Sequence, residues 1–227
     1  MTARAGLAAQ QGRHKPLSYD AWLCLSNASS SNFFESADLK YQSAEVLGRP
    51  IEDAVTALVG GLTAGGRVLV VGLGASASLA QLVVTELIGC FERERPGLAA
   101  LAIGADGAAL SALAAMPAAA ASSSFDAVLA RQIETLGQPG DLLLLIDSEG
   151  NHPALLAAVR AAQAKDMTVI ALTGRTGGAV RSLLHDTDVL VAVPHERRVR
   201  VLETHLLVLH CLCDAIDLQL LGEQDAA

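Results

Sequence analysis

VLVVGLGASA, residues 68–77, is the stretch of this chain that decides its fold class. Aliphatic and β-branched residues run into a G-x-G-x-S turn, and a helical pattern follows. The glycines of such a turn let backbone N–H groups approach a ligand, and the helix N-terminus adds partial positive charge. The stretch therefore predicts a buried strand and an anion-binding turn, with Gly72, Gly74 and Ser76 as ligand-binding candidates.

A second loop of the same kind follows the apolar run at residues 141–146. It reads DSEGNH, residues 147–152, and carries two carboxylates where a phosphate-binding loop would carry hydroxyl groups. Ligands of a parallel sheet bind beyond the carboxyl ends of the strands, where both loops and Asp106 are expected to meet. The further ligand-binding candidates are Asp106, Asp147, Ser148, Glu149, Gly150 and Asn151.

Strand and helix patterns alternate along the rest of the chain, and repeated βα units predict a parallel sheet with right-handed crossovers. We expect an α/β fold, a three-layer αβα sandwich preceded by N-terminal helices at 32–46 and 50–62, with a break at Gly48–Pro50. The expected strands are 67–72, 99–103, 141–146, 167–172 and 188–193. The expected later helices are 76–90, 106–115, 124–136, 152–164, 178–184 and 198–221.

Composition narrows the class of protein further. The 227 residues carry a formal net charge of −8 and show no basic stripe, so direct nucleic-acid binding is not expected. No uncharged apolar run reaches ~18 residues, so no membrane span is expected. The four cysteines form no C-x-x-C pair, which favours reduced thiols and a cytoplasmic location.

The domain organisation is predicted from the same patterns. Residues 1–30 show few periodic apolar positions and are expected to form a poorly ordered extension. Residues 31–222 are expected to form a single domain. Residues 223–227 are expected to be a short polar tail.

Several segments resemble the SIS (sugar isomerase) domain and, within it, the phosphoheptose isomerase group. The resemblance implies a flavodoxin/Rossmann-like five-stranded sheet, a homotetramer or dimer of dimers, and pockets between subunits. It also implies conversion of sedoheptulose 7-phosphate to D-glycero-D-manno-heptose 7-phosphate, often with zinc. The segments that carry it are GGRVLVVGLGASASLAQ (65–81), FERERPGLAALAI (91–103), ARQIETLGQPGDLLLLI (130–146), MTVIALTGRTGG (167–178) and ETHLLVLHCLCDAID (203–217), with FFES (33–36) and GN (150–151).

The loops depart from the family pattern. The first family loop reads G-N-G-G-S, but this chain has Leu73 and Ala75 at the second and fourth positions and keeps Ser76. In the second loop, Asp147, Ser148, Glu149 and His152 stand at the family's hydroxyl positions. Like charges there predict weakened phosphate binding. Glu149 could instead point to solvent, and Asp147 could cap the helix that starts near His152.

The family's metal and acid–base positions are also changed. Leu82 and Leu202 stand where the family has polar groups, whereas Glu86 and His205 are kept. We expect Glu86 and His205 to be a remnant acid/base pair, or a buried hydrogen bond between helices or subunits. We expect His210 to be structural. Neither a metal ion nor another cofactor is expected.

These departures favour a noncatalytic regulator similar to the DnaA initiator-associating relatives. Its protein partner would be DnaA, bound through the C-terminal Leu220 and Leu221. The alternative is a working phosphoheptose isomerase. A nicotinamide enzyme is disfavoured, because the acidic residue that binds the ribose should follow the glycine motif by about 20 residues, and Asp106 lies about 30 beyond it.

Overall fold

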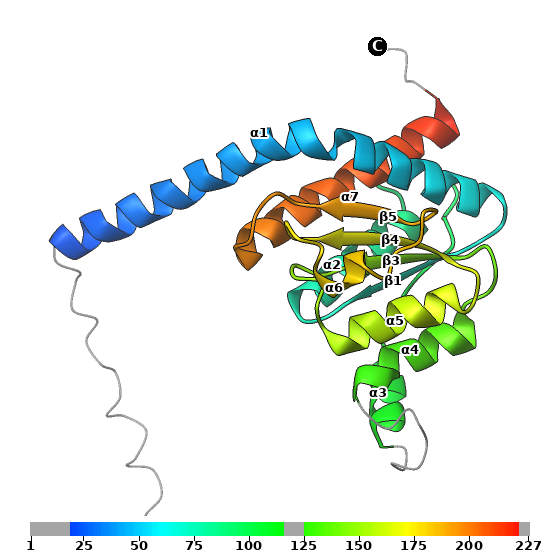
Figure 1. Cartoon of the computed structure of the whole chain (residues 1–227). Helices are drawn as coiled ribbons and strands as arrows, with labels where there is room; N and C mark the ends of the chain where they lie inside the picture. The colour runs from blue at the N-terminus through cyan, green and yellow to red at the C-terminus, as the bar shows by residue number, and fades with distance from the viewer. Residues whose placement is uncertain (1–18, 116–124, 223–227) are drawn as a thin grey trace, which may run out of the picture. The chain divides into compact units, whose positions relative to one another are not determined.

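The computed structural model describes residues 19–115 and 125–222 (Figure 1). The chain divides into two compact units, Met1–Asp38 and Leu39–Ala227. In the first unit, residues 19–38 are helical and belong to α1 (Tyr19–Thr63), which continues into the second unit. Residues 19–30 of the segment that we expected to be a poorly ordered extension are therefore helical. The remainder of that segment, residues 1–18, lies outside the described residues, as does the expected tail at 223–227.

A five-stranded parallel sheet forms the centre of the second unit, with strand order β2-β1-β3-β4-β5. Val68 of β1 pairs with Ala100 of β2 on one side and with Leu142 of β3 on the other. All carboxyl ends of the strands therefore meet at one edge. The strands are β1 (Val68–Gly72), β2 (Ala100–Ala102), β3 (Leu142–Ile146), β4 (Thr168–Thr173) and β5 (Val189–Ala192).

Helices follow each strand, as the alternating patterns predict. The α/β fold class, with helices on both faces of a five-stranded parallel sheet, is thereby confirmed. Each helix after α1 begins and ends within three residues of the expected bounds. The helices after α1 are α2 (Ala75–Ile88), α3 (Gly107–Ala114), α4 (Phe125–Leu136), α5 (Pro153–Gln163), α6 (Gly178–Arg181) and α7 (Arg198–Leu221).

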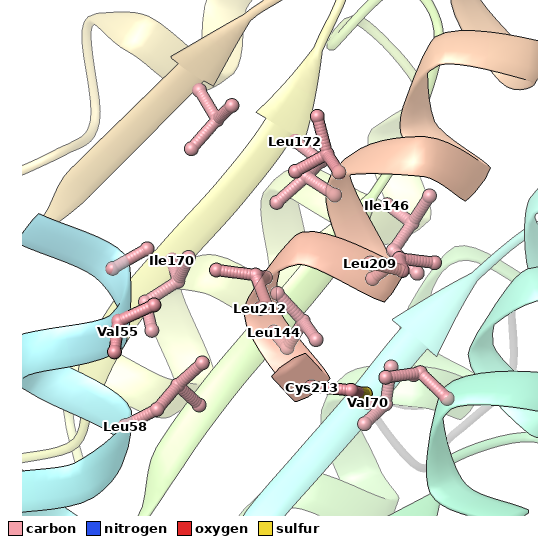
Figure 2. Close-up of a cluster of buried hydrophobic side chains, with 14 of the residues drawn as sticks. Val55, Leu58, Val70, Leu144, Ile146, Ile170, Leu172, Leu209, Leu212 and Cys213 are labelled. Carbon is pink, nitrogen blue, oxygen red and sulfur yellow. The ribbon is translucent and has the colours of Figure 1, made fainter. Parts of the chain in front are cut away.

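Alternating side chains of the strands build two separate hydrophobic clusters. Val70, Leu144 and Ile170 pack against α2, α7 and the part of α1 that lies in the second unit, and Figure 2 shows this cluster. Leu143 and Val169 lie on the opposite face and pack against α4 and α5 (Figure 1). Burial on both faces explains why the strands read as continuous aliphatic runs.

The expected break at Gly48–Pro50 is wrong, because α1 continues through it as one helix with Pro50 inside. Proline removes one backbone donor and disfavours a helix interior. The buried positions of α1 nevertheless keep one helical face across it: Leu39, Leu47, Ala54 and Leu58 are all at most 3% exposed. Packing of this face against the sheet offsets the cost of the proline.

No described helix has a segment that is long and apolar enough to cross a membrane.

Candidate functional site

A cavity of about 410 Å³ lies at the edge where the carboxyl ends of β1 and β3 meet. It is bounded by the loops that lead into α2 and α5 and by the first residue of α7. Helix N-termini favour anions, so this edge has the chemistry that both loops predict. The lining residues are Leu73, Gly74, Ala75, Ser76, Asp147, Ser148, Glu149, Asn151, His152 and Arg198.

The first loop contributes a glycine turn and a hydroxyl group. Gly74 precedes α2 with φ of 57° and provides no side-chain cap for the helix. The Ser76 hydroxyl follows in the first turn and has no hydrogen-bond partner within the described part of the chain. Gly72 lies beneath the turn, where a Cβ atom would collide with the Ser76 backbone. Gly72 therefore shapes the loop rather than lining the cavity.

Asp147 lines the cavity, and its carboxylate also closes its own loop. Its Oδ2 accepts hydrogen bonds from the Gly150 N–H at 2.6 Å and the Glu149 N–H at 3.2 Å. The expectation that Asp147 caps the next helix is wrong, since His152 Nδ1 accepts the capping bond from the Ala154 N–H at 3.2 Å. The Asp147 carboxylate therefore has local donors that stabilise its charge.

Gly150 and Asn151 hold the second loop against the segment that leads into α6. Gly150 has φ of 73°, and a Cβ atom there would collide with the carbonyl oxygen of Gly177. Only glycine allows this approach of the two backbones. Asn151 Oδ1 accepts a hydrogen bond from the Ala179 N–H at 2.9 Å. Both residues therefore fix the loop, and Asn151 also lines the cavity.

Asp106 does not belong to this cavity. Its carboxylate caps α3 by accepting hydrogen bonds from the Ala108 N–H at 2.8 Å and the Ala109 N–H at 3.2 Å. It lines a separate, mostly apolar cavity next to α3 and α4. Asp106 was proposed from its position after a strand, but β2 is at the edge of the sheet, and the carboxylate is used locally.

Arg198 is a lining residue that the sequence reasoning missed. It is exposed and begins α7. The basic cluster Arg197, Arg198 and Arg200 is visible in the sequence, but the sequence does not show that the first turn of α7 reaches the glycine loops. The sheet order decides this, because α7 follows β5 but packs against α2, which follows β1, three strand positions from β5.

His205 lies on α7 and is fully buried. Its Nε2 is 3.0 Å from the Thr173 carbonyl oxygen, while Nδ1 has no hydrogen-bond partner among the residues that the structure describes. The bond to a carbonyl places the ring proton on Nε2. Burial lowers the pKa of His205 to about 4, although the Thr173 carbonyl and the Asp147 charge oppose the shift. His205 is therefore a neutral group that binds the carboxyl end of β4.

Glu86 is half-buried near the C-terminal end of α2 and is not among the residues that line this cavity. Burial raises the pKa of Cys213 to about 12, and the charge of Glu86 is the next largest cause of this rise. The Glu86 carboxylate therefore lies near that part of α7. Cys213 is about two helical turns beyond His205. No hydrogen bond joins Glu86 to His205 in the described residues, so the structure does not form the expected pair within one chain.

The zinc site that the resemblance implies does not fit these donors. Leu82 and Leu202 offer no ligand atom, and Glu86 and His205 do not contact one another. Within the described ranges, no group of three or more His, Cys, Asp or Glu side chains could hold a metal ion. Zinc sites in proteins normally use three or four such ligands.

The two C-terminal leucines proposed as a partner site differ in environment. Leu220 packs partly buried against the hydrophobic cluster, whereas Leu221 is 40% exposed at the end of α7. His210 packs against Phe91, with ring centroids 5.4 Å apart.

We expect the neutral, buried His205 to make the fold sensitive to acid. The pKa of this group is about 6.5 when unfolded and about 4 when folded. Between these values the unfolded chain binds an extra proton, so this contribution is complete above about pH 6.5 and is lost as the pH falls toward 4. The loss amounts to about 3 kcal/mol.

Urea denaturation between pH 7 and pH 4.5 measures the effect. The control is His205→Gln, whose side chain can still donate to Thr173 but does not titrate. The difference in the free energy of unfolding between wild type and variant separates the titration of His205 from that of the carboxylates. Parallel pH profiles of the two proteins would contradict the assignment.

The fold and the two-loop site define a class of protein that comparison with known families identifies. Residues 32–174 match the model of the SIS domain. The chain therefore belongs to the SIS-domain family.

Within this family, the chain is similar to several proteins named phosphoheptose isomerase. A phosphoheptose isomerase from Methylibium petroleiphilum is 55% identical over 194 residues, covering 86% of this chain and 94% of the relative. Another, from Thiobacillus denitrificans, is 45% identical over 194 residues, covering 86% of this chain and 95% of the relative. The structure of the phosphoheptose isomerase GmhA from Neisseria gonorrhoeae superposes with a TM-score of 0.77 at 38% identity, covering 85% of this chain and 98% of that one.

These relatives correct the functional hypothesis. The expectation of a noncatalytic DnaA-binding regulator is wrong, because the similar proteins reported above are named as isomerases. That expectation treated Asp147 and Glu149 as two charges facing the phosphate. The structure shows that backbone N–H groups hold the Asp147 carboxylate. The assumed repulsion is therefore smaller than the sequence suggested.

Proposed function

We propose that this protein is a phosphoheptose isomerase. The observation that carries the proposal is the 55% identity, across 94% of its length, to a relative of that name. The cavity supports the proposal, because the hydroxyl groups of Ser76 and Ser148 lie where helix N-termini favour a phosphate and have no hydrogen-bond partner among the described residues.

Isomerisation of a ketose to an aldose moves a proton between C1 and C2 and another between the two attached oxygens. We propose Glu86 as the group that moves the carbon-bound proton, since a half-buried carboxylate suits this role. Ser76 and Glu86 are ten residues apart on α2, about 15 Å along the helix axis. A ligand held by its phosphate at Ser76 therefore has to extend along α2.

The test is a direct assay with sedoheptulose 7-phosphate as substrate. We expect the purified protein to form the heptose phosphate with a turnover of ~1 s⁻¹ or more, the low end of ordinary enzymes. Sedoheptulose without phosphate is the matched control and should turn over much more slowly. An absence of product from the phosphorylated sugar would overturn the proposal.

We also propose that the chain associates with copies of itself. Large apolar side chains remain exposed on two helices of the second unit, among them Tyr41 and Val46 on α1 and Leu207 and Leu218 on α7. A symmetric assembly would bury such faces. Light scattering should show a stable oligomer at micromolar concentration, and a monomer would contradict this.

A cytoplasmic location fits the same proposal. Cys90, Cys211 and Cys213 are free thiols, which are typical of proteins in reducing compartments.

A further inference from the structure

Most polar side chains of the second loop are already engaged within the protein. Asp147 binds the N–H groups of its own loop, Asn151 binds the Ala179 N–H, and His152 binds the Ala154 N–H. Because the His152 bond uses the Nδ1 lone pair, Nε2 carries the ring proton. These side chains therefore shape the cavity but contribute no positive charge to it.

Arg198 differs from the other charged groups that line the cavity. Its guanidinium is exposed and has no hydrogen-bond or ion-pair partner within the described residues. Arg200, one half-turn further along α7, is instead held by Glu203, with Nη1 at 2.5 and 2.6 Å from the two carboxylate oxygens. Among the described residues that line the cavity, Arg198 is thus the one lysine or arginine, and its side chain is available to a ligand.

The negative charge of Glu149 calls for a cation in the cavity if an anion is to bind there. It is exposed, lines the same cavity, and replaces a hydroxyl group of the family pattern. A carboxylate at this position opposes the binding of an anion. The serine hydroxyls and the helix N-termini supply only dipoles and partial charges against it.

We infer that Arg198 binds the phosphate group of the substrate and replaces the missing hydroxyl groups of the second loop. A guanidinium presents several N–H donors in a planar fork that matches two phosphate oxygens. Arg198 is the first residue of α7, and it lines a cavity whose lining also includes Ser76 and Ser148. This inference rests on the proposed function, because it names the residue that selects the phosphorylated sugar.

Calorimetry with sedoheptulose 7-phosphate tests the inference, using Arg198→Gln, Arg198→Lys and the control Arg160→Gln. Arg160 is also exposed and without a partner in the described residues, but it lies on α5 outside the cavity. We expect Arg198→Gln to weaken binding 10- to 100-fold, as for loss of a charged hydrogen bond. Arg198→Lys should fall between wild type and Arg198→Gln, and Arg160→Gln should bind as wild type does.

Inorganic phosphate and unphosphorylated sedoheptulose identify the part of the ligand that Arg198 binds. Binding of inorganic phosphate should weaken in Arg198→Gln, and binding of sedoheptulose should not change. Affinity of Arg198→Gln for sedoheptulose 7-phosphate within twofold of wild type would overturn the inference, as would a wild type that does not bind this ligand. Turnover by wild type is measured separately, so binding without turnover would reject the proposed function and leave the role of Arg198 intact.

Discussion

Replacing Arg95 by methionine should lower the free energy of unfolding by about 3–5 kcal/mol, the usual cost of breaking a buried ion pair. Arg95 and Asp217 form such a pair, and each side chain is 1% exposed. Arg95 Nε donates to Asp217 Oδ1 at 2.5 Å, while its Nη1 and Nη2 donate to the carbonyl oxygens of Leu87 and Glu86 at 2.8 and 3.0 Å. The variant leaves the Asp217 charge buried without a partner.

Urea denaturation monitored by circular dichroism measures this loss. The matched control is Arg93→Met, whose guanidinium makes an exposed bond to the Gly222 carbonyl oxygen and should cost less than about 1 kcal/mol. The double variant Arg95→Met with Asp217→Leu should recover much of the stability, because it removes both buried charges together. A loss below 1 kcal/mol in Arg95→Met would show that the pair does not stabilise the fold.

Glu86→Gln should lower kcat for sedoheptulose 7-phosphate by about 10²- to 10⁴-fold, the usual contribution of a general acid or base. Glutamine keeps the size of the side chain but cannot take up a proton. The Glu86 carboxylate has no hydrogen-bond partner within the described residues, so the fold should tolerate the change. KM should change much less than kcat, because Glu86 does not line the cavity that binds the phosphate.

Steady-state kinetics with Glu94→Gln as the control separates catalysis from general surface charge. Glu94 is exposed in the loop that follows α2, and its removal should leave kcat unchanged. A Glu86→Gln variant with kcat within tenfold of wild type would exclude Glu86 as the acid/base group. The isomerase proposal itself would then stand on the turnover of the wild-type protein.

The sequence by itself determined the layered fold. The run at 68–72 and the runs of the other four strands are mostly aliphatic. Such continuous apolar runs indicate strands that helices cover on both faces. The glycines at 72, 74 and 150 marked the loops, because tight turns and close backbone approach depend on local chain geometry. The same sequence patterns placed both loops at the edge where the carboxyl ends of the strands meet, because parallel strands run in one direction.

Only the tertiary structure decided how the polar residues are used. Asp147 looked like a charge facing the ligand, but folding places two backbone N–H groups on its carboxylate. Glu86 and His205 looked like a pair, but α7 positions His205 under Thr173 and brings Cys213 near Glu86. Arg198 became a candidate because the strand order carries α7 to the glycine loops. Hydrogen bonding and burial depend on neighbours distant in the chain, and residue type alone does not specify them.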